Sequence, residues 1–262
     1  MDFLPQLIAL DMDGTLLDGN GQLPEQFADV ASRATAAGVT LAPASGRQLA
    51  TLQRMFPESS TFLAENGTVV MYEGRIVETT AIAAADYQAI LDAAGTLDVA
   101  HTVLACTPHT AFVRPDQLDL AAVEVSKYYA SVTPVDDLRT IDEPIIKVAV
   151  HCAAGAEEHL YPTFLNAVGD LNVAVSGAVW MDVMSPLGNK GRGLATLAAA
   201  AGVELSRTAA FGDFLNDYEL LHTAGTAVAM ANAHPRLKEI ADLIAPPNTE
   251  HGVIQVLDQW LP

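Results

Sequence analysis

Apolar runs with the length of buried strands alternate with helical patterns near the start of the chain. The apolar runs cover residues 7–10, 39–42 and 62–64, and the helical patterns cover 24–37 and 48–56. This alternation is typical of βαβ units, whose parallel strands are buried on both faces and therefore read as short apolar runs. A hairpin is predicted over 68–79, because Glu73 and Gly74 separate two strand-like runs.

The same alternation returns in the last part of the chain. Strands are predicted at 209–211, 226–230 and 243–245, and helices at 194–201 and 253–260. The first and last parts of the chain are therefore predicted to share one α/β fold.

The middle of the chain has a different pattern. Extended segments are predicted at 102–106, 111–114, 145–152 and 173–181, and they interleave with helical patterns at 84–94, 118–129 and 157–168. This arrangement indicates an α+β insertion whose sheet is largely antiparallel.

Two acidic residues directly follow the first predicted strand. The segment Asp11-Met12-Asp13-Gly14-Thr15 places both carboxylates at the carboxyl end of that strand, where open α/β sheets bind their ligands. Like charges this close raise one pKa or require a cation, and Mg²⁺ binds such oxygen ligands. One carboxylate can then act as nucleophile and the other as proton donor and acceptor. The alternative is a surface turn, in which Asp and Gly are common.

A small polar turn follows the second predicted strand. Ser45-Gly46-Arg47 offers a hydroxyl, backbone N–H groups and a cation to an oxyanion, although Arg47 could equally pair with a surface acid. Asn66 lies in the segment Glu65-Asn66-Gly67, where it either faces a substrate or occupies a turn.

Two further segments lie in the last part of the chain. Lys190 precedes a helical stretch in a Gly-rich loop, from which its ammonium can reach a phosphoryl oxygen. Asp213 follows a short strand, with Asn216 and Asp217 at helical spacing, and these oxygens would complete a metal site.

Each of these segments has a plainer explanation when taken alone, such as an ordinary turn, a solvated lysine or a helix cap. Together they supply carboxylate, hydroxyl, ammonium and carboxylate groups, which are the parts of Mg²⁺-assisted phosphoryl transfer. Segments on both sides of the insertion must meet at one site. We therefore expect residues 81–187 to form a lid with hinges near Thr80 and Leu187, and residues 1–80 and 188–262 to form the core.

Composition narrows the possible partners. The 262 residues are 50% hydrophobic and carry a formal net charge of −19, which argues against nucleic acid or an anionic membrane as a partner. No apolar segment reaches the roughly 20 residues of a membrane helix. Cys106 and Cys152 lie in strand-like runs and suit small core residues in a reducing compartment, so we expect a cytoplasmic protein. We expect it to act as a monomer or a homodimer.

The chain resembles the haloacid dehalogenase-like hydrolases, and within them the Cof-type phosphatases with a large inserted cap. The matching motifs are D-x-D-G-T at 11–15, Ser45 before Gly-Arg, Lys190 before Gly, and G-D-x-x-N-D at 212–217. The segments 65–67, 229–233 and 250–253 also resemble family signatures. The resemblance implies a Rossmann-like, doubly wound parallel-sheet core with an inserted α+β cap domain that determines substrate specificity.

The resemblance also implies roles for individual residues. Asp11 would attack phosphorus to form an aspartyl-phosphate, and Asp13 would act as general acid and base. Mg²⁺ would be held by the Asp11 carboxylate, the Asp13 backbone carbonyl, Asp213 and Asp217. Phosphoryl oxygens would be bound by Ser45 and Lys190, and substrate or its phosphate would also be contacted by Gly46, Arg47, Asn66 and Asn216.

The expected activity is hydrolysis of small phosphorylated metabolites, such as sugar phosphates, flavin mononucleotide or pyridoxal phosphate. One alternative is a phosphomutase, which would return the phosphoryl group to the substrate. Another is a receiver module that accepts phosphate on an aspartate without hydrolysing a substrate. The acid–base candidate Asp13 and the large insertion disfavour the receiver.

Overall fold

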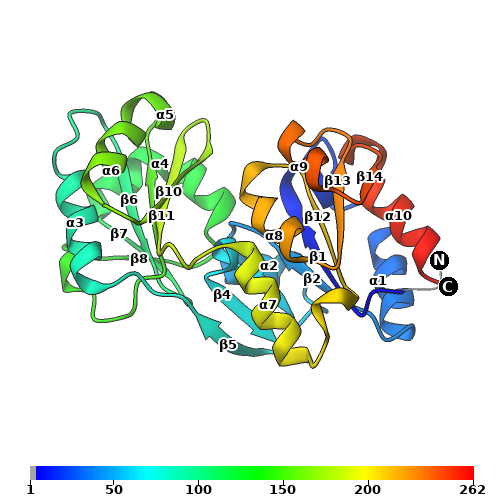
Figure 1. Cartoon of the computed structure of the whole chain (residues 1–262). Helices are drawn as coiled ribbons and strands as arrows, with labels where there is room; N and C mark the ends of the chain where they lie inside the picture. The colour runs from blue at the N-terminus through cyan, green and yellow to red at the C-terminus, as the bar shows by residue number, and fades with distance from the viewer. Residues whose placement is uncertain (1–3) are drawn as a thin grey trace. The chain divides into compact units, whose positions relative to one another are not determined.

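The computed structural model describes residues 4–262, which form two compact units (Figure 1). The core unit combines the chain up to Gly46 with Phe56–Glu78 and Asn189–Pro262. The cap unit combines Arg47–Met55 with Thr79–Gly188. The unit boundaries after Glu78 and after Gly188 lie within two residues of Thr80 and Leu187, near which the sequence predicts hinges. Residues 47–55 group with the cap unit rather than with the core unit.

The core unit is built on a sheet in the order β14-β13-β12-β1-β2-β3-β4-β5. The strands from β14 to β3 pair in parallel, and β3 pairs with β4 in the antiparallel direction. All residues of β1 and β12 are buried, which explains the apolar runs at 7–10 and 209–211 within them. The strands are β1 Leu7–Asp11, β2 Thr40–Ala44, β3 Phe62–Ala64, β4 Val69–Tyr72, β5 Arg75–Thr79, β12 Thr208–Gly212, β13 Thr226–Met230 and β14 Leu243–Ala245.

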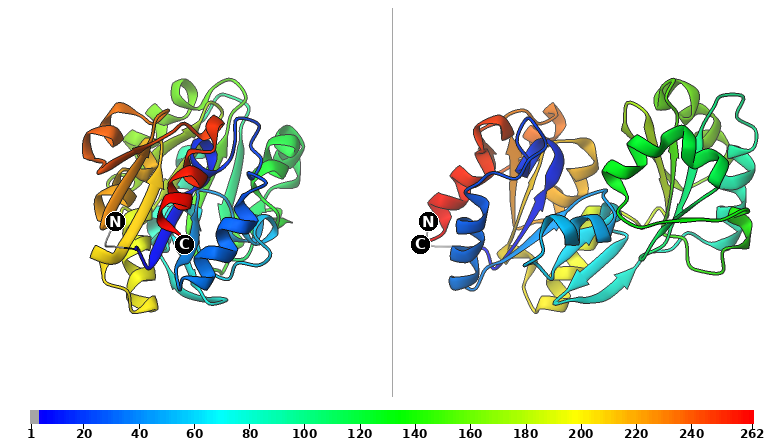
Figure 2. Two further views of the ribbon diagram at one scale, coloured as in Figure 1. Left: turned by 90° about the vertical axis from the view of Figure 1, so that its right-hand side faces the viewer. Right: turned by 180° about the vertical axis from the view of Figure 1, so that it is seen from behind.

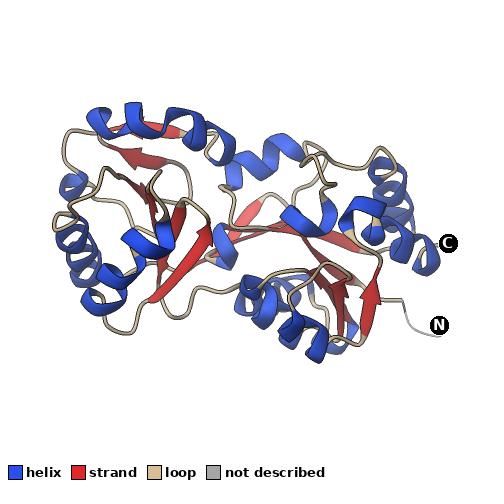
Figure 3. Cartoon of the chain, turned by 90° about the horizontal axis from the view of Figure 1, so that it is seen from above, coloured by secondary structure: helices blue, strands red, loops and turns tan. Residues whose placement is uncertain are grey.

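Helices cover both faces of this sheet, as in a doubly wound fold (Figures 1 and 3). Helix α1 packs against α10, and α7 packs against α8. The side chain of Asn189 accepts a hydrogen bond from the N–H of Arg192 at the start of α7, and Gly202 ends the helix with φ 67°. The predicted α/β class is confirmed. The helices are α1 Phe27–Ala36, α7 Lys190–Ala201, α8 Tyr218–Thr223, α9 Pro235–Ile240 and α10 Gly252–Trp260.

The cap unit contains a second sheet in the order β10-β11-β9-β6-β7-β8 (Figure 2). Its pairs are antiparallel except for β7 with β8. Helices α3, α5 and α6 share a hydrophobic core with one face of this sheet. The elements are α2 Leu49–Met55, α3 Ala84–Ala94, β6 Thr102–Cys106, β7 Ala111–Val113, α4 Pro115–Tyr128, β8 Val132–Pro134, β9 Lys147–His151, α5 Ala156–His159, α6 Tyr161–Ala167, β10 Asn172–Gly177 and β11 Trp180–Met184.

Strand β8 of the cap unit was not predicted, and two predicted segments of this unit differ from the structure. The single extended segment predicted at 173–181 is a hairpin of β10 and β11, with an irregular register between Val175 and Gly177. The helix predicted at 157–168 is divided at Leu160 into α5 and α6. Pro162 lies in the first turn of α6, and because proline lacks an N–H it could not continue the hydrogen bonding of α5.

Two other sequence expectations concern burial and membrane spans. Cys106 and Cys152 are both buried and form no disulfide within residues 4–262. Over the same residues, no helix combines the length and apolarity needed to cross a membrane.

Candidate active site

The site begins at the carboxyl end of β1. Asp11 is buried there, and the chain then turns through Met12–Leu16, where Gly14 has φ 81°. A Cβ added to Gly14 would lie 2.2 Å from Oδ2 of Asp213. A larger residue therefore cannot stand at this position without displacing the carboxylate that follows β12.

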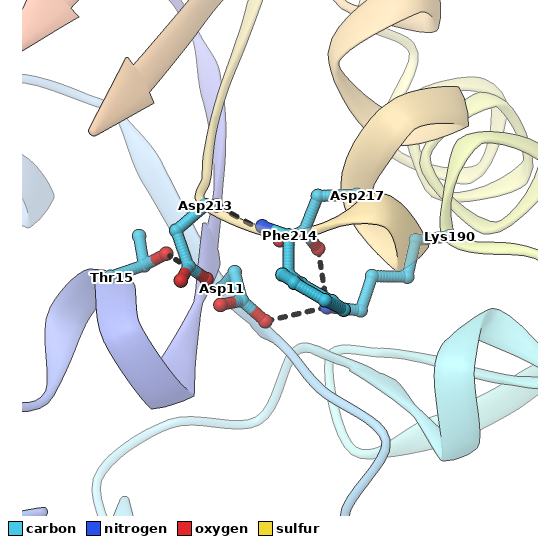
Figure 4. Close-up of polar contacts among 6 residues, drawn as sticks. All are labelled: Asp11, Thr15, Lys190, Asp213, Phe214 and Asp217. Carbon is cyan, nitrogen blue, oxygen red and sulfur yellow. Dashed lines mark hydrogen bonds and ion pairs between the residues drawn. The ribbon is translucent and has the colours of Figure 1, made fainter. Parts of the chain in front are cut away.

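A buried lysine joins two carboxylates at this strand end (Figure 4). Lys190 is the first residue of α7 and is 0% exposed. Its Nζ donates to Oδ1 of Asp11 and to Oδ1 of Asp217, each at 2.5 Å. Side chains of the D-x-D-G-T motif, of Lys190 and of the G-D-x-x-N-D motif therefore meet in the core unit.

Asp213 and Asp217 are fixed by the turn after β12. The N–H of Asp213 donates to Oδ2 of Asp217 at 3.1 Å, and Thr15 Oγ1 donates to Oδ1 of Asp213 at 3.3 Å. A Cβ at Gly212 would lie 2.5 Å from the Cβ of Asp217. Because Gly212 has no side chain, the Asp217 side chain can occupy this space.

Burial and crowding change the ionisation of these groups. Burial, followed by the charge of Asp217, raises the pKa of Asp11 to about 8. The same two causes raise the pKa of Asp213 to about 6. Burial alone would lower the pKa of Lys190, but Asp11 and Asp217 raise it above its ordinary value. The site thus holds more carboxylate groups than ammonium groups, and this imbalance favours a further cation.

The arrangement fits a hard divalent cation. One carboxylate oxygen from each of Asp11, Asp213 and Asp217 lies within 4.8 Å of the others. All of these donors are oxygens, which Mg²⁺ prefers to nitrogen or sulfur. The side chain of Asp13 lies outside this group of carboxylates and is exposed in the turn after β1.

The Ser45 turn lies beside the turn at 65–67. Ser45 is buried, its N–H donates to the carbonyl of Leu63, and its carbonyl accepts from the N–H of Asn66, both at 2.9 Å. A Cβ at Gly46 would come within 3.0 Å of Oδ1 of Asn66. A Cβ at Gly67 would lie 2.5 Å from the carbonyl oxygen of Asn189. The turn at 65–67 therefore packs against both the Ser45 turn and the residue that precedes α7.

Arg47 and Asn216 are the two remaining site residues that the sequence predicts. Arg47 belongs to the cap unit, where Nη1 donates to the carbonyl of Lys127 at 3.4 Å and the guanidinium lies 5.3 Å from the ring centre of Tyr128. Asn216 is exposed in the short turn Leu215–Asp217. Their predicted contacts with substrate remain predictions.

Asn232 and Asn248 hold the turn after β1, a role that was not predicted from the sequence. Asn232 Nδ2 donates to the carbonyl of Gly14 at 2.8 Å, and its Oδ1 accepts from the N–H of Asn248 at 3.1 Å. Asn248 Nδ2 donates to the carbonyl of Leu17 at 2.9 Å. The signature-like segments at 229–233 and 250–253 mark this region, but only the fold shows that the two amides reach the turn after β1.

Substituting Asn232 by Ala is expected to lower kcat about fivefold and leave KM nearly unchanged, because the hydrogen bond to the Gly14 carbonyl, of about 1 kcal/mol, no longer holds the turn. The control is Asn166→Ala, which removes a similar amide bond, from Nδ2 to the carbonyl of Pro162, in the cap unit. Steady-state kinetics of both variants would test the role, and equal kcat values for Asn232→Ala and the wild type would contradict it.

The family comparison agrees with this geometry. The model of the haloacid dehalogenase-like hydrolases matches residues 8–257. The chain is 29% identical to the 5-amino-6-(5-phospho-D-ribitylamino)uracil phosphatase YbjI of Escherichia coli, over 98% of this chain and 96% of YbjI. It is 26% identical to the 5-amino-6-(5-phospho-D-ribitylamino)uracil phosphatase YitU of Bacillus subtilis, over 99% of both chains.

Solved structures agree as well. The crystal structure of a haloacid dehalogenase-like hydrolase from Bacteroides thetaiotaomicron matches with a TM-score of 0.83 and 23% identity, over 97% of this chain and 99% of that chain. This likeness concerns the fold. The family match over nearly the whole chain, together with the acidic site at the end of β1, identifies the protein as a phosphatase that belongs to the haloacid dehalogenase-like hydrolase family.

Proposed function

We propose that the chain is a Mg²⁺-dependent phosphatase of small phosphorylated metabolites that acts through a phosphorylated Asp11. The observation that carries this proposal is the contact of Lys190 Nζ with both Asp11 and Asp217 at the carboxyl end of the core sheet. Such an ammonium can bind a phosphoryl oxygen while the adjacent carboxylate attacks.

In the first step, a carboxylate oxygen of Asp11 attacks phosphorus and the bond from phosphorus to the leaving oxygen breaks. Asp13 gives its proton to that oxygen. In the second step, water attacks the phosphoryl group, Asp13 takes its proton, and inorganic phosphate leaves Asp11. The exposed position of Asp13 in the turn after β1 suits a group that must exchange protons with substrate and water.

The remaining residues of the core unit support these two steps. Lys190, the Ser45 hydroxyl and the Gly46 N–H would bind the phosphoryl oxygens, and Asn66 would contact the substrate. Asp11, Asp213 and Asp217, with the backbone carbonyl of Asp13, would hold Mg²⁺. When bound, the cation neutralises carboxylate and phosphoryl charge in the transition state.

The substrate is a small alcohol esterified with phosphate. The names of YbjI and YitU give a ribityl phosphate as their substrate, so 5-amino-6-(5-phospho-D-ribitylamino)uracil is the first compound to test. Sugar phosphates, flavin mononucleotide and pyridoxal phosphate follow. The cap unit, around residues 81–187, would select among these leaving groups.

The proposal predicts release of inorganic phosphate from at least one of these compounds in Mg²⁺. Removing the cation with EDTA is expected to lower the rate about a hundredfold or more, because a bound divalent ion supplies several kcal/mol of charge stabilisation. Adding excess Mg²⁺ should restore the rate. Rates that are equal in Mg²⁺ and EDTA would contradict metal dependence. Dependence on a bisphosphate activator would indicate the phosphomutase, and a phosphorylated aspartate that persists for hours would indicate the receiver.

A further inference from the structure

Helix α7 carries Lys190 at its first position, and few of its other side chains can fix its rotation. Of its 12 residues only Lys190, Arg192 and Thr196 have polar side chains, and most of the others are Ala or Gly. Small side chains form shallow ridges, so packing alone specifies the rotation of such a helix weakly. The directional bonds of the three polar side chains therefore determine how α7 is turned.

The backbone at the start of α7 is packed closely on two sides. A Cβ added to Gly191 would lie 2.3 Å from the carbonyl oxygen of Glu219, and a Cβ added to Gly193 would lie 3.1 Å from the Cα of Gly67. Because this packing leaves no room for a side chain, the start of the helix can shift little. Rotation about the helix axis is then the motion that side-chain bonds must limit.

Both remaining polar side chains of α7 bind a single carboxylate. Arg192 Nη2 donates to Oε1 of Glu78 at 2.8 Å, and Thr196 Oγ1 donates to Oε2 of Glu78. The bond from Thr196, followed by the bond from Arg192, lowers the pKa of Glu78 and so favours its charged form. Glu78 lies on β5 in the same core unit as α7, and its side chain is 25% exposed. One carboxylate thus contacts two successive turns of the helix.

The bonds to Glu78 and the bonds of Lys190 lie on opposite sides of α7. Each residue of an α-helix rotates the side-chain direction by about 100°, which places Arg192 about 200° and Thr196 about 240° around the axis from Lys190. On its own side of the helix, Lys190 Nζ donates to Asp11 at 2.5 Å (Figure 4). A rotation of α7 that lengthens the bonds on one side therefore displaces the bonds on the other.

We propose that Glu78 is a positioning residue for phosphoryl transfer, because it fixes the rotation of α7 and thereby holds the ammonium of Lys190 at the transferring group. Glu78 acts through the helix and not on the reacting atoms. A misplacement of about 1 Å is enough to slow the reaction, since a charged donor stabilises the transition state only at hydrogen-bond distance. This inference rests on the proposed function, in which Lys190 binds a phosphoryl oxygen.

The test is a double-mutant cycle on kcat for p-nitrophenyl phosphate in Mg²⁺, with every variant assayed well below its unfolding midpoint. Glu78→Leu is expected to lower kcat about fivefold in the wild-type background, equivalent to about 1 kcal/mol, and to leave KM within about twofold. In the Lys190→Met background the same change should lower kcat less than about twofold, because the ammonium that Glu78 positions is gone. A purely structural effect would give the same factor in both backgrounds, since changes at independent sites add in free energy.

Two milder variants give independent measurements. Thr196→Val keeps the shape of the side chain and removes one of the two bonds, so kcat should fall about threefold. Glu78→Gln keeps the size of the side chain and one acceptor oxygen, so it should retain more activity than Glu78→Leu, with kcat about twofold below the wild type. Both losses should shrink in the Lys190→Met background.

The control is Asp29→Leu, which removes an exposed carboxylate that pairs with Arg33 on α1 and should leave kcat unchanged. Equal losses from Glu78→Leu in both backgrounds, or wild-type kcat in the folded Glu78→Leu protein, would overturn the inference and leave the proposed function standing. A wild type that releases no phosphate from p-nitrophenyl phosphate in Mg²⁺ would instead contradict the proposed function.

Discussion

Asp11→Asn is expected to lower phosphate release about 10⁴-fold or more with every substrate, as loss of a nucleophile does in other enzymes. An amide nitrogen or oxygen cannot form the acyl phosphate that the proposed first step requires. Asn has nearly the same size as Asp, so the site at the end of β1 should keep its shape. The measurement is phosphate release in Mg²⁺ by the purified variant.

The matched control is Asp258→Asn, which changes an exposed carboxylate that pairs with Arg33 and has no proposed catalytic role. This variant should keep wild-type turnover. Thermal unfolding of Asp11→Asn should show a single folded protein, which separates loss of chemistry from loss of structure. Wild-type turnover by Asp11→Asn would remove Asp11 as the nucleophile.

Lys190→Met is expected to reduce both activity and stability. It leaves the buried carboxylates of Asp11 and Asp217 without the ammonium that lies 2.5 Å from each of them. Breaking a buried ion pair from one side costs about 3–5 kcal/mol, which corresponds to a fall in the unfolding midpoint of about 10 °C. Turnover should fall about a hundredfold or more, because a charged donor to the transferring phosphoryl group is lost.

Mg²⁺ provides a second readout for this variant. A divalent cation bound by the remaining carboxylates replaces part of the missing positive charge, so Mg²⁺ should raise the unfolding midpoint of Lys190→Met more than that of the wild type. Lys127→Met, which removes an exposed lysine paired with Glu124, should leave the unfolding midpoint close to that of the wild type. A Lys190→Met protein as stable as the wild type without Mg²⁺ would show that the ammonium is not needed to balance the carboxylates.

The sequence predicted the core unit well because its strands are buried on both faces and its chemical groups follow those strands directly. The runs 7–10 in β1 and 209–211 in β12 are wholly apolar, and Asp11 and Asp213 lie at or just beyond the carboxyl ends of the two strands. Parallel strands bring such ends to one edge, so local motifs were sufficient to indicate that Asp11, Lys190, Asp213 and Asp217 lie together.

Other features depend on pairing between distant residues and were not predicted. The bonds from Asn232 to Gly14 and from Asn248 to Leu17 join segments with no recognisable relation in the sequence. Likewise, Glu78 reaches Arg192 and Thr196 across 114 and 118 residues of sequence. The division of the helix at Leu160 was missed, although Pro162 provided a local signal for it.

The connectivity of the core sheet also governs when the protein can become active during synthesis. Strand β1 pairs with β12, so Leu7 can pair with Thr208 only after Thr208 has left the ribosome. All strands of the cap sheet, in contrast, lie between Thr102 and Met184. Until then one edge of β1 lacks a partner, and such apolar edges promote aggregation of nascent chains. Since Lys190, Asp213 and Asp217 also emerge late, a chain interrupted in the cap unit carries Asp11 but lacks these three side chains.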